Sequence, residues 1–264
     1  MTRVVLSEMV RLRRPGFLIG WFGLTAVFAV LINVVMFRVS SDAAGPTDGP
    51  GVSFPTVAEL LSSDGIVAGL DAASSIFGVI ALSFWALAGA ADYSTGLIRV
   101  LVAAEPRRWR LVMGKWLALA VVTGAAVLVA LVVNVAVAPV AASSAGLEPS
   151  AWGTDLPTVL LGAALNLYLA LLVWGTIGLA LALVTRSAGV AIGVGVGWVL
   201  LLESVIAAAV DDIADWMPGA TIGALATGGN ATIDRGTALA LGAAYTGAAL
   251  AVTLWVQTRR DITD

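Results

Sequence analysis

Residues able to perform acid–base, nucleophilic or metal chemistry are few in this chain of 264 residues. Cysteine and histidine are both absent, which excludes disulfides, thiolate catalysis and imidazole metal sites. The one lysine, Lys115, stands in the sequence GKW at the start of an apolar run, and the phosphate-binding pattern GxxxxGK[ST] does not occur. We therefore expect no catalytic residue, bound cofactor or metal in this chain.

Carboxylates are the remaining groups with ligand or proton-transfer chemistry. Asp211, Asp212 and Asp215 gather in a polar connector, where we interpret them as a solvated surface. Glu203 differs, because it falls inside an apolar run, where an ionised group is costly and is usually paired or facing water. Its side chain either reaches the nearby membrane surface or belongs to a transport path or gate.

Two asparagines and three glycines also stand out within apolar runs. Asn33 and Asn166 have two interpretations, as hydrogen bonds between helices or as polar lining of a path. Gly189, Gly193 and Gly197 are spaced by four and therefore share one stripe of a helix, which lets another helix backbone approach closely. That second helix lies either in the same chain or across a subunit interface.

The composition shows which elements must position these residues. Hydrophobic residues make up 59% of the chain and charged residues 12%, with a mean hydropathy of +0.98, whereas a soluble domain has about 25% charged residues. The apolar runs are continuous, which indicates helices and excludes a barrel. We predict one all-α polytopic membrane domain over residues 1–264, with six spans: Phe17–Phe37, Ala72–Ala91, Leu111–Val137, Val159–Val184, Ala188–Val210 and Thr237–Val256.

The positive charges predict the orientation of these spans. With the N-terminus in the cytoplasm, 12 of the 14 Lys and Arg residues lie inside and only Arg38 and Arg235 lie outside. We therefore expect a multi-pass protein of the plasma membrane with both termini cytoplasmic. Residues 1–16 carry apolar and basic stripes at helical spacing before Pro15 and Gly16, which fits either an interfacial helix or a simple positive-inside anchor.

The connector 92–110, between the second and third spans, is compact and basic. Its apolar residues recur at helical spacing and Pro106 ends the pattern. This spacing predicts a short amphipathic helix between membrane and a protein partner.

This loop resembles that of the ABC exporter permeases of the second type, which have the type V fold. The resemblance rests on an acidic residue leaving the second span, a Gly followed by apolar residues, a Pro with basic neighbours, and a Gly-Lys pair entering the third span. Asp92 stands where Glu is commoner, and Leu97 where Thr is common. The matching residues are Asp92, Gly96, Leu97, Ile98, Leu101, Pro106, Arg107, Arg108, Gly114 and Lys115.

The resemblance implies an ATP-driven exporter with its ATPase on separate subunits. The loop, including Arg99, would then be a coupling helix docked on a nucleotide-binding subunit that holds ATP and Mg. A second permease, identical or related, would complete the complex through the first and fifth spans, and no nucleic acid is expected as a partner. The resemblance also implies short re-entrant helices within 211–236, where the alternative is a loosely ordered outer loop.

The sequence does not distinguish between several classes of substrate. A drug, a lipid and a hydrophobic peptide all fit a cavity lined by Ala, Leu and Val. The alternatives to an exporter are a secondary transporter, which would need intramembrane acidic residues for ion coupling, a membrane interaction protein without transport activity, and an intramembrane enzyme, for which no catalytic cluster is present.

Overall fold

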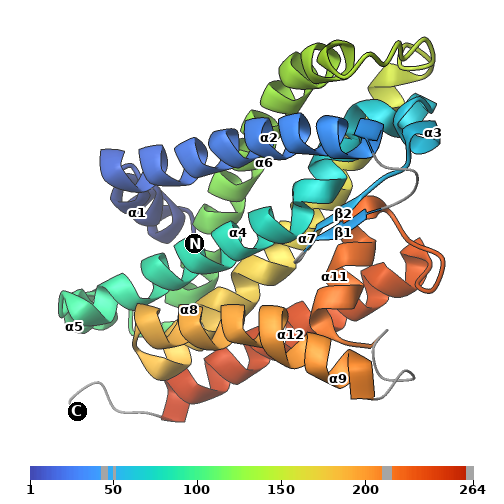
Figure 1. Ribbon diagram of the computed structural model, residues 1–264. Helices are drawn as coiled ribbons and strands as arrows, with labels where there is room; N and C mark the ends of the chain where they lie inside the picture. The colour runs from blue at the N-terminus through green and yellow to red at the C-terminus, as the bar shows by residue number, and fades with distance from the viewer. Residues whose placement is uncertain (43–46, 50–51, 210–215, 260–264) are drawn as a thin grey trace.

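The computed structural model describes residues 1–42, 47–49, 52–209 and 216–259, and Asp211, Asp212 and Asp215 lie outside this part of the chain. Helices dominate it (Figure 1). The long ones are α2 (Pro15–Asp42), α4 (Ala68–Ser94), α6 (Arg108–Ser144), α7 (Leu156–Thr185) and α12 (Arg235–Arg259). The shorter ones are α1 (Thr2–Leu12), α3 (Val57–Leu60), η1 (Ser63–Val67), α5 (Leu97–Ala104), α8 (Ala188–Gly197), η2 (Trp198–Leu202), α9 (Glu203–Ala209) and α11 (Pro218–Thr227).

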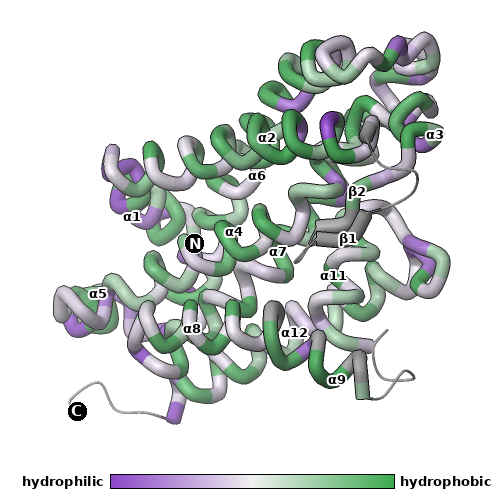
Figure 2. The backbone as a smooth tube through the Cα atoms, in the orientation of Figure 1, coloured by the Kyte–Doolittle hydropathy of each residue, from purple (hydrophilic) through white to green (hydrophobic). Residues whose placement is uncertain are grey.

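The five long helices are long and apolar enough to cross a membrane. Each contains one of the predicted apolar runs, because a continuous run of about 20 apolar residues is stable in hydrocarbon only as a helix. The tube coloured by hydropathy shows these helices as mostly hydrophobic, with hydrophilic residues concentrated at α1, α5 and the connectors (Figure 2). The prediction of a multi-pass membrane protein built mainly of helices is confirmed at this level, whereas a short two-stranded hairpin is present that the sequence did not predict.

The predicted fifth span, Ala188–Val210, is not one uniform helix. It consists of α8, the π-helical segment η2 and α9, which follow one another without a break. None of the three is long enough to count among the five candidate spans. A π-helical turn often marks a functional or strained position inside a helix.

Helix α6 is longer than its apolar run predicts. It continues through Pro139 to Ser144, although the sequence places a connector from Ala138 onward. The residues around the proline are largely alanine, the best helix former, and their propensity offsets the hydrogen bond that a proline removes.

Helices α4 and α7 form the centre of the bundle. In the most apolar stretch of each, 67% of the residues are buried, against 28% in α2 and 17% in α12. Glycines let the two central helices approach: a Cβ on Gly178 would lie 2.3 Å from the carbonyl oxygen of Leu82, and one on Gly175 only 2.4 Å from the indole of Trp85. The Trp85 indole also donates to the hydroxyl of Thr123 on α6 at 2.9 Å.

One end of the bundle carries α3, η1 and a small antiparallel hairpin. Its strands, β1 (Thr47–Gly49) and β2 (Val52–Phe54), pair with Thr47 opposite Phe54. In the connector between α6 and α7, the buried indole of Trp152 donates to the carbonyl of Leu60 at 2.9 Å. At the opposite end lie α1, α5 and the end of α12, although they are far apart in sequence (Figure 1).

Candidate functional site

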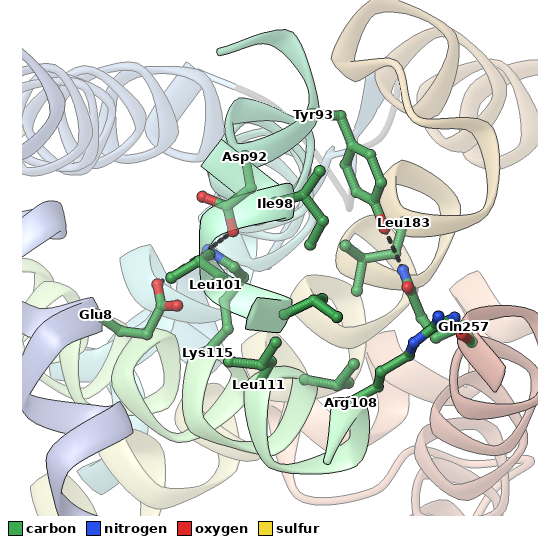
Figure 3. Close-up of a pocket in the computed structure, with 12 residues that line it drawn as sticks. Glu8, Asp92, Tyr93, Ile98, Leu101, Arg108, Leu111, Lys115, Leu183 and Gln257 are labelled. Carbon is green, nitrogen blue, oxygen red and sulfur yellow. Dashed lines mark hydrogen bonds and ion pairs between the residues drawn. The ribbon is translucent and has the colours of Figure 1, made fainter. Parts of the chain in front are cut away.

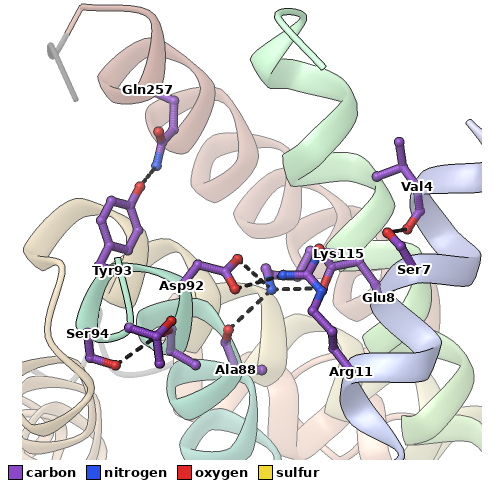
Figure 4. A network of polar contacts seen from close by, with 12 residues as sticks. Val4, Ser7, Glu8, Arg11, Ala88, Asp92, Tyr93, Ser94, Lys115 and Gln257 are labelled. Atoms are coloured by element: carbon purple, nitrogen blue, oxygen red, sulfur yellow. Dashed lines mark hydrogen bonds and ion pairs between the residues drawn. The ribbon is translucent and has the colours of Figure 1, made fainter. Parts of the chain in front are cut away.

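Four charged side chains form a closed ring where α1, α4 and α6 meet (Figure 4). Lys115 Nζ lies 2.9 Å from Glu8 Oε2 and 3.0 Å from Asp92 Oδ2. Arg11 completes the ring, because Nη1 donates to Asp92 Oδ1 at 2.8 Å and Nη2 pairs with Glu8. Lys115 also donates to the carbonyl of Ala88 at 3.3 Å. Each carboxylate thus contacts both cations.

The ring is buried. Glu8 is 1% exposed, and Asp92 and Lys115 are each 6% exposed. Removing such charges from water costs several kcal/mol per ion, and only close pairing with further hydrogen bonds offsets that cost. Here two positive and two negative charges alternate, so the cluster has no net charge. Its members are therefore interdependent: losing one leaves a buried charge without its counterpart.

Local sequence explains how the ring is assembled. Glu8 and Arg11 are three residues apart on α1, so they project from the same face. Gly114 lets α1 approach α6, because a Cβ there would lie 2.5 Å from Val4 Cγ1. The adjacent Lys115 is thereby brought within reach of Glu8. The N-terminal helix is consequently docked against the bundle by both packing and charge.

A short helix, α5, lies between α4 and α6. Gly96 precedes it with φ +69°, in the left-handed region where glycine is favoured because other residues are strained. The turn at Gly96 redirects the chain just beyond the end of α4, whose last turn contains Asp92. The ring therefore lies beside the N-terminal end of α5.

The two faces of α5 have different surroundings. Ile98, Leu101 and Val102 line a narrow cavity of about 20 Å³ together with Glu8 and Lys115 (Figure 3). Arg99 and Val100 are exposed, Val100 by 63%. The sequence pattern places partner docking on the apolar stripe, but in the structure this stripe, including Leu97, is half-buried and faces the bundle. The outward surface of α5 consists of Arg99, Val100, Ala103 and Ala104.

A second polar contact joins the end of α12 to the same region. The Gln257 side-chain amide donates to the hydroxyl of Tyr93 at the end of α4, and Arg108 donates to the Gln257 backbone carbonyl. All three residues line the cavity beneath α5 (Figure 3). The first and last helical elements of the chain are thus both tied to the segment that carries α5.

The residues between α5 and α6 are mostly surface-facing. Pro106 and Arg107 are exposed, and the Arg107 backbone N–H donates to Glu105 at 3.3 Å. Arg110 forms an ion pair with Glu105 at 3.2 Å. This short linker is therefore braced locally, and its charges remain accessible beside the outward face of α5.

The two asparagines serve contacts between helices. Asn33 on α2 donates to Asn134 Oδ1 on α6 at 2.9 Å, and Asn134 donates to the carbonyl of Ile66 at 2.7 Å. Asn166 accepts a hydrogen bond from Arg235 at 3.2 Å and so joins α7 to the start of α12. Of the two interpretations left open by the sequence, these contacts favour hydrogen bonding between helices over a path.

Glu203 caps a neighbouring helix. Its carboxylate accepts from the Gly219 backbone N–H at 2.8 Å and from the Trp198 indole at 2.7 Å. Gly219 lies in the first turn of α11, where unpaired N–H groups favour a negative charge. Glu203 is only 8% exposed. Through these contacts Glu203 joins α9 to α11.

The glycine stripe of α8 does not pack inside the subunit. A Cβ on Gly189, Gly193 or Gly197 would meet nothing within 4 Å. The glycine that does allow close packing is Gly195, whose Cβ would lie 2.8 Å from Leu82. Among the described residues, the stripe is therefore an open surface.

In the sequence, Asp92 and Lys115 are connected only by the family resemblance, and no motif marks Glu8 or Arg11 as site residues. One signal was available. Lys115 is the sole lysine and begins an apolar helix, where a buried ammonium requires carboxylates. Glu8 is the only acidic residue before the first span, so it was an available counter-ion.

A protein-family model described as "Protein of unknown function (DUF2705)" matches residues 26–213. The match covers more than half of the chain, which therefore belongs to this family. The matched residues begin within α2 and end beyond α9, so they include α5 and two members of the ring, Asp92 and Lys115. No curated protein matches the chain.

Proposed function

We propose that this DUF2705 protein is the membrane-spanning permease subunit of an ATP-driven exporter, and that α5 docks on a separate ATPase subunit. The observation that carries the proposal is the position of α5. It is a short amphipathic helix with no fully buried residue, and it projects from the bundle between two long helices. The ring of charges holds the N-terminal end of α5 in place, so a force on α5 is passed to α1, α4 and α6.

The outward face of α5 has the character of a docking surface. Val100 is 63% exposed beside the cationic Arg99 and two alanines, and small side chains let a partner approach the helix backbone. Arg107, nearby in the linker, adds a second exposed cation. Such a surface offers apolar contact area with charge at its edge, as many protein interfaces do.

The proposed topology has six crossings, with both termini, α1 and α5 in the cytoplasm of a plasma-membrane protein. The fifth crossing, which joins the five long helices to make six, is the continuous α8, η2 and α9, of ten, five and seven residues. At a rise of about 1.5 Å per residue, their combined length is close to the roughly 30 Å of the hydrocarbon core. Helix α11 then turns back toward the membrane as a re-entrant element, held by Glu203.

The working complex contains two permeases and two ATPase subunits. The open glycine stripe of α8 supports pairing with a second permease through this helix, since small residues let helices approach closely in lipid. ATP and Mg are bound by the ATPase subunits, and this chain performs no covalent chemistry. The substrate is an apolar or amphipathic molecule such as a drug, a lipid or a peptide, moved outward.

The test is purification of the tagged chain from native membranes in mild detergent, followed by assay of co-purifying ATPase activity. The wild type should bring down this activity. Val100→Asp should reduce it at least tenfold, because the substitution places a charge at the centre of a desolvated contact. Ser150→Asp, at an exposed position in the α6–α7 connector, is the matched control and should retain the activity.

The same assay separates this proposal from its alternatives. A secondary transporter or a membrane interaction protein would purify without ATPase activity from the wild type. Activity that is equally high in Val100→Asp would remove α5 from the docking surface.

A further inference from the structure

A second cavity lies between the bend joining α1 to α2 and the junction of α4 with α5. Its volume is about 100 Å³, several times the roughly 10–15 Å³ that one water needs. From this cavity we infer a binding site for the headgroup of an anionic phospholipid. The inference requires only that the chain spans a membrane and is independent of the proposed transport function.

The charges of the cavity fit an anion. Arg11, Arg14 and Lys115 contribute three positive charges to the lining, and Glu8 and Asp92 contribute two negative ones. The ring described above occupies all of these except Arg14. In the described part of the chain, no hydrogen bond or ion pair holds the exposed Arg14 guanidinium. The lining therefore has a net charge of +1, located at the cavity's rim.

The rest of the lining is apolar. Phe17, Leu87 and Leu97 face the cavity, and Leu87 is 43% exposed. Thr95 adds a hydroxyl at the edge. A soluble anion gains nothing from the apolar residues, whereas a phospholipid places its phosphate beside Arg14 and the first segments of its acyl chains along the apolar residues.

The cavity lies at the depth in the membrane where lipid headgroups are found. Pro15 begins the membrane-spanning helix α2, and Arg14 directly precedes it. Amphipathic helices such as α1 lie in the headgroup layer. A guanidinium at the junction of an interfacial helix and a spanning helix is therefore level with lipid phosphates. The apolar residues follow on the membrane side, on α2 and α4.

Arg13 offers a matched control. It is adjacent to Arg14 and also exposed, but it does not line the cavity. The variants Arg14→Gln and Arg13→Gln remove the same charge from the same segment. A third variant, Ala91→Phe, fills the cavity from α4 without changing charge, because Ala91 is a half-buried part of its lining.

The experiment is native mass spectrometry of the full chain extracted from nanodiscs of phosphatidylcholine containing phosphatidylglycerol. The wild type should retain one phosphatidylglycerol per chain and little phosphatidylcholine. Arg14→Gln should lower the apparent affinity about tenfold, which corresponds to loss of one charge-assisted contact of about 1.4 kcal/mol. Ala91→Phe should lower it by a similar factor, because its ring occupies the space of the headgroup. Arg13→Gln should bind as the wild type does.

Two results would overturn the inference. Equal losses in Arg13→Gln and Arg14→Gln, with none in Ala91→Phe, would mean diffuse attraction to a basic segment. Displacement of the retained lipid by millimolar inorganic phosphate or by glycerophosphoglycerol, which lacks acyl chains, would assign the cavity to a soluble phosphate. Normal size-exclusion profiles for all variants would show that the comparison concerns folded protein.

Discussion

The ammonium group of Lys115 lies 2.9 Å from a carboxylate oxygen of Glu8, 107 residues earlier in the chain. This ion pair fastens the N-terminal helix to the helix that follows α5. Lys115 also pairs with Asp92, which lies on the helix that precedes α5. One buried cation thus holds together the three helices on which the position of α5 depends.

Replacing Lys115 with Met should destabilise the protein by about 3–5 kcal/mol, because two buried carboxylates then share one cation. Denaturation of the purified protein in mixed detergent micelles would measure this loss. Adding Glu8→Gln should recover part of it, since the remaining Arg11 and Asp92 balance each other. Arg13→Gln, an exposed change of the same charge, should stay within about 0.5 kcal/mol of the wild type. Strict additivity of the Lys115 and Glu8 changes would show that the pair is not coupled.

Gly114→Leu should release α1 from the bundle. The new side chain would overlap Val4, whose Cγ1 would lie 2.5 Å from a Cβ at this position. We expect faster proteolysis within residues 2–12 and a loss of roughly 1–3 kcal/mol from overpacking. Gly162→Leu, on α7 where nothing lies within 4 Å, is the control. An unchanged cleavage rate in Gly114→Leu would contradict close packing of α1 on α6.

Glu203→Ala should weaken the attachment of α11, because the Gly219 N–H and the Trp198 indole lose their acceptor. The expected cost is about 1 kcal/mol, as for loss of a helix N-cap. Glu203→Gln keeps one oxygen acceptor and should lose less. Hydrogen exchange at the first turn of α11 would report the difference. Equal protection in all three proteins would exclude a capping role for this carboxylate.

Two glycine variants on α8 separate assembly from folding. Gly193→Leu has open space around it and should leave the monomer stable while weakening the proposed pairing of two subunits. In Gly195→Leu the new side chain would overlap Leu82, because a Cβ at position 195 would lie 2.8 Å from Leu82. This variant should lower monomer stability instead. Crosslinking between two differently tagged copies measures the first effect and thermal unfolding the second. Undiminished pairing in Gly193→Leu would remove the α8 stripe from the proposed subunit interface.

The proposed orientation rests on the distribution of 12 inner and 2 outer basic residues. In this cysteine-free chain, single cysteines at Arg99 and Ser150 can be labelled selectively, since both positions are exposed. An impermeant maleimide should label position 150 in intact cells and position 99 only after permeabilisation. The reverse pattern would invert the topology and place α5 outside the cell.

The sequence by itself determined the class of protein and the positions of its long helices. Runs such as Phe17–Phe37 and Val159–Val184 predicted α2 and α7, because the length and apolarity of a run alone decide whether a helix can cross lipid. It also determined that α5 exists, since apolar residues at helical spacing between Gly96 and Pro106 define a short amphipathic helix.

Tertiary structure alone decided which charges meet and which helix faces are covered. The sequence predicted the apolar stripe of α5 but not that Leu101 faces inward while Val100 faces outward. The ring of Glu8, Arg11, Asp92 and Lys115 depends on the rotation of three helices about their own axes. The hydropathy of a helix does not depend on that rotation. The rotation is set by packing contacts such as Val4 against Gly114, between residues more than 100 positions apart. Local sequence patterns carry no information about such pairs.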